Sequence, residues 1–411
     1  MMRKMSLLVL AVSFLCIAQS AGASNWTATS QYLLNVTGQQ CLAYSGYVYC
    51  IAGASTYFIN NTYSSAETGQ GLANWAGQRP YPIDAFGQSC ALASGSAYCV
   101  GGYNSSSYIS LTYAAMLSNG TFSPWRSLAQ YPVALSGMSC ASSGSYLACI
   151  GGANSSGSDT GYAYYTEIYG NVMVNPANRN SSIQWASTSG YPIGISSASC
   201  QSSGGYVYCV GGHSGQGYTN STLFTTLNAS GLGAWRDAPS YPIKASYISC
   251  AISSGYLVCI GGYNKTSYSN RVYAAQISPS GLLAWQRLLN YPMPIGEAGC
   301  TSSGQKLYCT GGYNGTAYTN ATYYLELSSA PPQTSTVGTQ PQNATGVSVN
   351  STTITAVSTV GSGNATVTGK APNSDLGMIY AIAAAALAVL VLALYYMHLR
   401  RTPRSKKPGK P

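Results

Sequence analysis

Short apolar and polar stretches alternate along residues 25–327, and the alternation repeats with a period near fifty residues. The second cysteine of each close pair falls at 50, 99, 149, 209, 259 and 309, and tryptophan falls at 26, 75, 125, 185, 235 and 285. Both series advance by 49, 50, 60, 50 and 50 residues. Because two independent markers share one period, the pattern predicts a repeat architecture.

The sequence pattern of each repeat unit predicts four short strands. In the second full unit, Phe86–Ala93 and Ser96–Gly102 flank the turn Ser94-Gly95; a third strand covers Tyr108–Leu117 and a fourth covers Phe122–Leu128. β-Branched and aromatic residues dominate these stretches, turn residues separate them, and a helical period is almost absent. The pattern therefore favours an all-β fold of the propeller type with six blades.

The unit resembles the kelch repeat at its central motif. An apolar run enters Gly-Gly, and a tyrosine and a tryptophan follow at fixed offsets. The resemblance covers about residues 26–327 and implies a six-bladed kelch-like β-propeller. The first unit departs from the motif with Ala52-Gly53, and the cysteine pairs and a Tyr-Pro after the tryptophan are additions to it. The residues that carry the resemblance are Val100-Gly101-Gly102, Val210-Gly211-Gly212, Ile260-Gly261-Gly262, Thr310-Gly311-Gly312, Tyr113, Tyr273, Tyr323, Trp125 and Trp285.

The two ends of the repeat region complement each other. Residues 25–30 contain a tryptophan strand with no hairpin before it, and residues 318–327 contain a tyrosine strand with no tryptophan after it. We expect the N-terminal strand to be the outer strand of the last blade. Such closure would leave no open edge between the first and last blades.

The cysteines come in pairs nine positions apart around a tight turn. With Ser94-Gly95 at the turn, Cys90 and Cys99 face each other at a non-hydrogen-bonded position, where Cα atoms lie about 4.5 Å apart. A disulfide fits that distance, whereas structural zinc favours a shorter spacing and four ligands. We therefore expect six disulfides, each within one blade. The pairs are Cys41–Cys50, Cys90–Cys99, Cys140–Cys149, Cys200–Cys209, Cys250–Cys259 and Cys300–Cys309.

The segments outside residues 24–328 predict targeting and anchoring. Residues 1–23 combine a basic start, an apolar run and small residues at the end, as in a signal peptide; a retained anchor is the alternative. Residues 329–375 are rich in Ser and Thr and predict a stalk. Residues 376–397 are uncharged and long enough for a transmembrane helix, and residues 398–411 form a basic tail. These features predict a single-pass type I membrane protein with an extracellular ectodomain and a cytoplasmic tail.

Charge and composition fit an exterior protein. The net charge of +10 comes mostly from the tail and the signal segment, so the ectodomain is nearly neutral and a nucleic-acid partner is not expected. An even number of cysteines outside the membrane favours an oxidising compartment. Asn-X-Ser/Thr sequons are frequent, which predicts a glycoprotein. The candidate glycosylation sites are Asn104, Asn154, Asn264, Asn314, Asn343, Asn350 and Asn364.

Candidates for chemistry are few. His213 is the only histidine of the ectodomain, and it stands in a loop. Asp84, Lys244 and Glu297 occupy links that enter new blades, where they could form a small charged site. Four arginines follow the tryptophans on predicted outer strands, namely Arg79, Arg126, Arg236 and Arg287. We therefore expect no enzyme activity, cofactor or metal; an extracellular hydrolase or oxidase acting on carbohydrate is the alternative.

One face of the propeller is a better candidate for binding. In a four-strand meander, the links between blades share a face with the loops after Gly-Gly. Tyrosines on that face offer flat amphipathic area for a protein or glycan; the alternative for the Tyr-Pro tyrosines is packing between blades. An extra ten residues between Cys149 and Trp185 could add a contact site. We expect a recognition, adhesion or envelope-structural role. The candidate face comprises Tyr81, Tyr131, Tyr191, Tyr241 and Tyr291 in the links and Tyr103, Tyr263 and Tyr313 in the loops.

Overall fold

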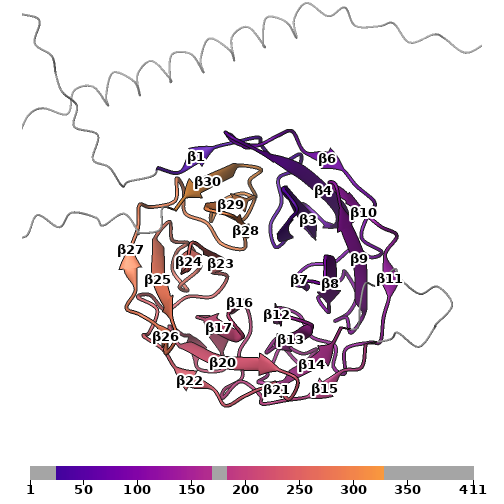
Figure 1. Ribbon diagram of the computed structural model, residues 1–411, viewed down its shortest axis with the longest axis vertical. Helices are drawn as coiled ribbons and strands as arrows, with labels where there is room; N and C mark the ends of the chain where they lie inside the picture. Colours follow the sequence, from indigo (N-terminus) through magenta and orange to yellow (C-terminus); the bar gives the residue numbers. More distant parts are fainter. Residues whose placement is uncertain (1–24, 169–182, 328–411) are drawn as a thin grey trace, which may run out of the picture. The chain divides into compact units, whose positions relative to one another are not determined.

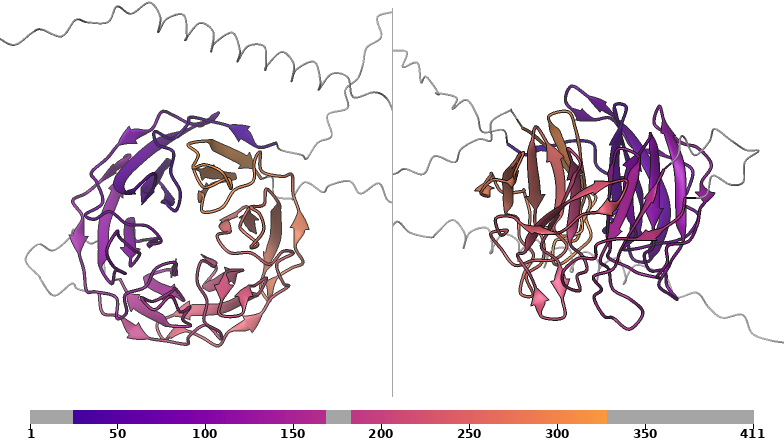
Figure 2. Two further views of the ribbon diagram at one scale, coloured as in Figure 1. Left: turned by 180° about the vertical axis from the view of Figure 1, so that it is seen from behind. Right: turned by 60° about the horizontal axis from the view of Figure 1, so that its bottom comes forward.

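Six small antiparallel sheets surround a central axis in the computed structural model of the protein (Figure 1). The structure describes residues 25–168 and 183–327, and these contain strands and no helix. Figure 2 shows the same ring from behind and from a tilted direction, with the inner strands around the central axis. The prediction of an all-β six-bladed propeller is confirmed.

The two inner strands of every blade form a tight hairpin. A two-residue turn closes each hairpin, and the first strand of the blade is the one that faces the axis. The innermost strands are β2 (Gln40–Tyr44), β7 (Ser89–Ala93), β12 (Ser139–Ser143), β16 (Ser199–Ser203), β23 (Ser249–Ser253) and β28 (Gly299–Ser303). The second strands are β3 (Tyr47–Ala54), β8 (Ser96–Val100), β13 (Tyr146–Ile150), β17 (Tyr206–Val210), β24 (Tyr256–Ile260) and β29 (Lys306–Thr310).

The outer half of each blade is less regular. The predicted fourth strand forms as very short pairings on the third strand, and the tryptophan lies just before the outermost of them. The third strands are β4 (Phe58–Thr68), β9 (Thr112–Ser118), β14 (Ala163–Glu167), β20 (Thr222–Asn228), β25 (Val272–Ser278) and β30 (Thr322–Glu326). The outer pieces are β1 (Thr27–Ala28), β5 (Gly71–Leu72), β6 (Ala76–Gly77), β10 (Thr121–Phe122), β11 (Arg126–Ser127), β15 (Ala186–Ser187), β21 (Gly231–Leu232), β22 (Arg236–Asp237), β26 (Gly281–Leu282) and β27 (Gln286–Arg287), and a small hairpin is made by β18 (His213–Ser214) and β19 (Gly217–Tyr218).

Left-handed residues shorten the inner strands relative to the prediction. The first strand of the second blade begins at Ser89 rather than Phe86, because Gly87 has a φ of 67°. The second strand ends at Val100, because Gly101 and Gly102 have φ values of 64° and 106°. An added Cβ at Gly102 would lie 2.9 Å from the backbone nitrogen of Gln88. The repeated Gly-Gly therefore ends a strand and permits close approach of the next link.

All six predicted disulfides are present. Each joins directly opposed residues of the inner hairpin, with Cα atoms 4.0–4.2 Å apart. In the second blade, for example, Cys90 pairs with Cys99 in the strand register. The disulfides therefore link the first strand of each blade to the second, as the turn position predicted.

The N-terminal strand closes the ring, as predicted. Strand β1 pairs antiparallel with β30, with Thr27 opposite Tyr324 and Ala28 opposite Tyr323. This places the first described residues on the outer side of a sheet whose other strands come from the last unit (Figure 1). The first and last blades thereby become ordinary neighbours.

Tryptophan and tyrosine join neighbouring blades in a contact that is repeated six times. Each tryptophan ring meets a link tyrosine edge to face at 4.8–5.0 Å between centroids. Each indole nitrogen also donates to a backbone oxygen of the preceding blade or link, as Trp125 does to Arg79 at 3.4 Å. Trp26 and Tyr291 make the same contact where the N-terminal strand closes the last blade, although they come from opposite ends of the repeat region.

This contact corrects the prediction that the link tyrosines belong to a binding face. Their rings are at most 4% exposed because they fill the space between blades against tryptophan. The packing alternative for the Tyr-Pro sequence is therefore the right one, and a ligand cannot reach these rings in the closed propeller. The tyrosines removed from the candidate face are Tyr81, Tyr131, Tyr191, Tyr241 and Tyr291.

Several predicted segments lie outside the described residues. They are the signal peptide (1–23), the stalk (329–375), the transmembrane helix (376–397) and the tail (398–411), together with the sequons at Asn343, Asn350 and Asn364. Within the described ranges, no helix has the length and apolar character needed to cross a bilayer.

Candidate functional site

The six innermost strands surround a cavity on the axis of about 490 Å³. Its lining consists mainly of small and hydroxyl side chains, because the innermost strands are built from sequences such as "SCASS" and "GCTSS". Glu297 is the only charged residue among the described residues that line it. The cavity is therefore a polar but nearly uncharged space.

Serine hydroxyls satisfy the free edges of the innermost strands. The amide nitrogens of Cys140 and Cys200 donate to Ser89 Oγ at 2.8 Å and to Ser139 Oγ at 2.9 Å, each on the preceding blade. Two residues after Cys140 on the same strand, Ser142 Oγ donates to the Leu92 carbonyl of the preceding blade at 2.6 Å. An innermost strand has no further strand on its axial side, so its backbone groups need other partners. The recurring serines supply them and tie adjacent blades together.

A ring of left-handed residues encircles one mouth of the cavity. In each blade the residue three positions before the first cysteine has a φ between 52° and 69°. Five backbone hydrogen bonds of 2.7–3.1 Å pass around the ring from blade to blade, for example from the Gly38 N–H to the Glu297 carbonyl. The first three positions are glycine and the last three are not. The ring consists of Gly38, Gly87, Gly137, Ser197, Tyr247 and Glu297.

The three side chains of this ring lie together on one half of the mouth. A non-glycine residue in the left-handed region costs about 1 kcal/mol. Ser197, Tyr247 and Glu297 belong to consecutive blades, and all three line the cavity. Backbone strain of this kind often occurs at functional sites, so this half of the mouth is the strongest candidate site of the molecule.

Glu297 is a perturbed acid. Removal from water raises the pKa of its carboxyl to about 7, and a hydrogen bond from Thr37 only partly opposes that effect. Thr37 Oγ1 donates to Glu297 Oε2 at 2.9 Å across the seam between the last and first blades. The carboxyl therefore exchanges its proton near neutral pH.

Two tyrosines accompany Glu297. Burial and the nearby Glu297 carboxylate raise the pKa of Tyr247, while a hydrogen bond with Ser197 acts in the opposite direction. Burial followed by Glu297 also raises the pKa of Tyr268 above its ordinary value. Tyr268 packs against Gly296, where an added Cβ would lie 2.6 Å from its ring. The acid and the two phenols thus form one group, and both phenols stay protonated at neutral pH.

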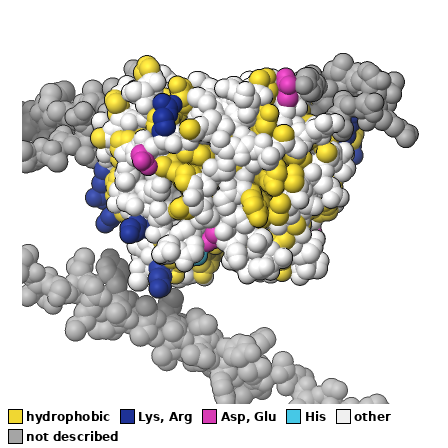
Figure 3. Space-filling model, turned by 90° about the horizontal axis from the view of Figure 1, so that it is seen from below, with side chains coloured by type: hydrophobic (Ala, Val, Ile, Leu, Met, Phe, Trp, Pro, Cys, Tyr) yellow, Lys and Arg dark blue, Asp and Glu magenta, His cyan; other side chains and the backbone are white. Residues whose placement is uncertain are grey.

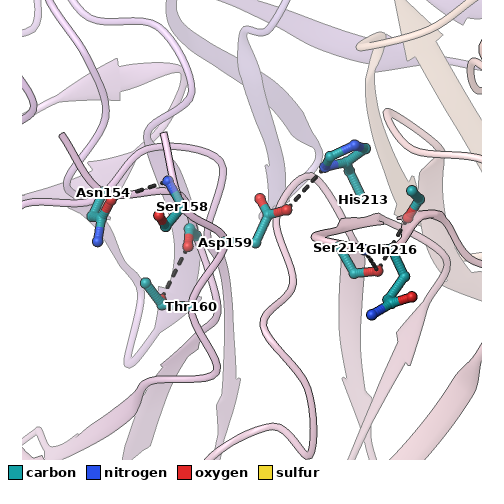
Figure 4. A network of polar contacts seen from close by, with 9 residues as sticks. Asn154, Ser158, Asp159, Thr160, His213, Ser214 and Gln216 are labelled. Atoms are coloured by element: carbon teal, nitrogen blue, oxygen red, sulfur yellow. Dashed lines mark hydrogen bonds and ion pairs between the residues drawn. The ribbon is translucent and has the colours of Figure 1, made fainter. Parts of the chain in front are cut away.

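His213 pairs with an aspartate of the neighbouring blade. Figure 4 shows His213 and Asp159 pointing toward each other, and His213 Nδ1 lies 2.9 Å from Asp159 Oδ2. The Asp159 side chain is 7% exposed and that of His213 is 43% exposed. This pair explains the isolated histidine as a contact between the loops of two blades. No group of three His, Cys, Asp or Glu residues suited to a metal occurs within residues 25–168 and 183–327.

The remaining charged candidates do not join Glu297. Asp84 and Lys244 are exposed in their links and do not line the cavity. Arg126, Arg236 and Arg287 lie on outer pieces β11, β22 and β27, as predicted. The side of the ring in Figure 3 shows scattered charges among uncharged polar atoms and patches of hydrophobic side chains. The predicted small charged site of three links is therefore not formed.

Two of the three candidate loop tyrosines, Tyr263 and Tyr313, belong to a connected surface, whereas Tyr103 contacts Phe58 and Tyr108 away from it. Ring contacts at 4.9–5.6 Å run through consecutive loops of the fourth, fifth and sixth blades. The bridges Ser246–Tyr263 and Gly296–Tyr313 place these loops on the same face as the links, as predicted. We call this surface the tyrosine track. It consists of Tyr218, Tyr263, Tyr268, Tyr313 and Tyr318, with His213 at one end.

The sequons in these loops have a structural role. Asn314 Oδ1 accepts hydrogen bonds of 2.8–2.9 Å from the Thr316 N–H, the Thr316 hydroxyl and the Ala317 N–H. Asn264 makes the same pattern, and the Asn104 and Asn154 side chains close their own loops similarly. Asparagine followed by Ser or Thr is therefore a turn motif here. Glycosylation of these residues stays a prediction.

Two substitutions at Asn314 distinguish its role in the turn from its predicted glycosylation. Asn314→Asp keeps the acceptor oxygen but removes the sequon, so we expect a change in unfolding free energy below about 0.5 kcal/mol. Asn314→Ala removes both and should destabilise the protein by about 1 kcal/mol, because the loop loses its acceptor. Thermal unfolding of protein made in a non-glycosylating host measures both variants. Equal stability of the two variants would contradict the turn role.

Sequence reasoning missed most of the cavity mouth. Asp159, Tyr268 and the left-handed ring were not singled out, and Glu297 was considered only as part of a charged trio. A usable signal was nevertheless present. When the units are aligned on their cysteines, Ser197, Tyr247 and Glu297 stand where the first three units have glycine.

Comparisons with known proteins support the fold. No protein-family model matches the chain, and no curated protein matches it. A solved structure described as "Structure of YjhT" matches with a TM-score of 0.58 and 13% sequence identity, over 73% of this chain and 97% of that chain. At this identity the match shows the fold alone. The fold and the axial cavity together define the chain as a six-bladed β-propeller.

Proposed function

We propose that the protein is a membrane-anchored, extracellular recognition module of kelch type. Its ligand, a protein or a glycan, binds the face that holds the tyrosine track and the cavity mouth. The predicted signal peptide and transmembrane helix support the location, and the disulfides fit an oxidising compartment.

One observation carries the proposal. The tyrosine track crosses three blades without interruption, and its members are partly exposed, with Tyr318 at 37% exposure. Tyrosines are enriched in binding surfaces because they bury large area with little loss of side-chain freedom. The tyrosine side chains of the track are uncharged, which favours a ligand recognised by shape and hydrogen bonds.

Screening the secreted ectodomain, residues 24–328, against glycans and extracellular proteins tests the proposal. A ligand should bind at least tenfold more weakly to the double variant Tyr263→Ser, Tyr313→Ser. The matched control is Tyr162→Ser, because Tyr162 is 50% exposed and does not belong to the track. Thermal unfolding of each variant checks that the fold is kept. Equal binding by both variants would overturn the proposed face.

An extracellular carbohydrate-active enzyme is the second candidate. The observation in its favour is Glu297, because a carboxyl with a pKa of about 7 can act as a general acid or base. Catalysis on sugars usually requires a second carboxylate or another catalytic group nearby, and the described cavity lining has one acid. Turnover of any sugar substrate that is lost in Glu297→Gln would favour this candidate over recognition alone.

A further inference from the structure

We propose that the cavity mouth binds an ammonium group, presented by a lysine side chain of a protein partner, between Glu297, Tyr247 and Tyr268. The inference rests on the proposed recognition function, because it names the chemical group that the ligand places at the axis. It also chooses a protein over a glycan as the partner.

The charge balance of the cavity favours a cation. No lysine, arginine or histidine among the described residues lines the cavity, so no cationic side chain there balances Glu297. The Glu297 carboxylate accepts a hydrogen bond from the Thr37 hydroxyl, which is neutral. A desolvated carboxylate without a counter-charge is costly, and a bound cation would compensate for that cost.

The two tyrosines favour an ammonium group in particular. Both lie close enough to Glu297 for its charge to raise their pKa values. Aromatic faces attract ammonium ions through their quadrupole, with about 0.5–2 kcal/mol per contact. Gly296 lets the Tyr268 ring approach the backbone beside Glu297. A carboxylate flanked by phenol rings is thus suited to a small cation.

The backbone supplies an independent argument. Tyr247 and Glu297 have φ values of 57° and 56° at positions where Gly38, Gly87 and Gly137 show that glycine serves the ring equally well. Glycine would remove a strain of about 1 kcal/mol at each position. The side chains themselves must therefore offset that cost, through the hydrogen bond between the last and first blades, through a ligand, or through both.

Lysine suits the site better than arginine. Its ammonium is a compact charge on a flexible stem, which can pass along apolar surface while the charge reaches a recessed partner. A guanidinium is planar and prefers two parallel acceptors on an accessible carboxylate. Glu297 Oε2 is already occupied by Thr37, so a point charge fits the remaining oxygen.

A seam role of Glu297 must be separated from ligand binding. Its hydrogen bond with Thr37 joins the last blade to the first, and that contact alone could explain the residue. Glu297→Gln keeps an acceptor for Thr37 and removes the charge. A purely structural role therefore predicts little effect of this variant on binding of a small cation.

The experiment titrates the ectodomain with n-butylammonium and, as a neutral isostere, n-butanol, followed by NMR or calorimetry at low ionic strength. We expect a dissociation constant on the order of 1 mM for n-butylammonium at pH 8 and at least tenfold weaker binding of n-butanol. Binding to Glu297→Gln should also be at least tenfold weaker. Asp84→Asn is the matched control, because it removes one negative charge from an exposed link on the same face.

The pH dependence supplies a second measurement. Because the carboxyl has a pKa of about 7, its ionised fraction falls about tenfold from pH 8 to pH 6, and binding should weaken by the same factor. Tyr247 and Tyr268 stay neutral over this range because their pKa values are raised. His213 pairs with Asp159 and neither residue lines the cavity, so His213→Gln is expected to leave the pH dependence in place.

Three outcomes would overturn the inference. They are equal binding of n-butanol, unchanged binding to Glu297→Gln, and tighter binding of glucosamine than of n-butylammonium, which would indicate an amino sugar. The proposed function fails separately, through the Tyr263 and Tyr313 variants. A ligand that still depends on those tyrosines while n-butylammonium does not bind would leave the recognition face intact.

Discussion

Reduction of the six disulfides is expected to unfold the propeller at room temperature. Each disulfide closes a loop with a sequence separation of 9, which corresponds to about 2–3 kcal/mol in the chain-entropy model. Six such contributions sum to about 12–18 kcal/mol, which is comparable to the free energy of unfolding of a typical domain, about 5–15 kcal/mol. The innermost strands are rich in small residues, whereas most of the large buried side chains of each hairpin lie on the second strand, so the disulfide is a main link between the two strands.

Circular dichroism with and without a phosphine reductant under mild denaturant measures this effect. A single-blade variant, Cys90→Ser with Cys99→Ser, provides the graded comparison and should lose about 2 kcal/mol while remaining folded. Both cysteines of that pair are buried, so the variant also places two serine hydroxyls in an apolar environment. A fully reduced protein that melts at the temperature of the oxidised one would refute the stabilising role.

Removal of the closing tryptophan is expected to have the second largest effect. Trp26→Ala should destabilise the propeller by about 3 kcal/mol, because the indole packs on Tyr291 at 4.8 Å and donates to the Leu289 carbonyl at 3.3 Å. The strand that it anchors makes only two residue pairs with β30. Without the indole, β1 should separate from β30 before the rest of the ring unfolds.

Trp125→Ala is the matched control, because Trp125 makes the same contact with Tyr81 within a continuous part of the chain. Both variants should lower the melting temperature, yet only Trp26→Ala should speed hydrogen exchange at the Tyr324 amide, which faces Thr27 of β1. Equal exchange at this amide in the two variants would show that β1 is not the weak point of the ring.

The repeat period made the fold predictable. Cysteine and tryptophan mark every unit, so the number of blades, the disulfide pairing and the closing strand followed from spacing alone. The link tyrosines were harder to place, because Tyr-Pro on a loop is compatible with both exposure and burial. Only the packing of Trp125 on Tyr81, and of its five equivalents, decided between the two.

The cavity mouth was less accessible to prediction for a physical reason. Its residues come from different blades, and their proximity depends on how the ring closes rather than on local sequence. The raised pKa of Glu297 depends on desolvation by neighbouring elements, which a single stretch of sequence does not contain. The departure from glycine at three of six equivalent positions was the only local trace of the site.

The closing strand also has a consequence for biosynthesis. Thr27 and Ala28 stand at the N-terminal end of the propeller, but their partners Tyr323 and Tyr324 are made only with its last unit. Earlier blades can form and oxidise as they emerge, because chains fold from the N-terminus during synthesis. The ring itself stays open until the sixth unit arrives. A chain that stops before that unit keeps an unpaired strand and an exposed tryptophan, features by which folding surveillance could distinguish incomplete molecules from finished ones.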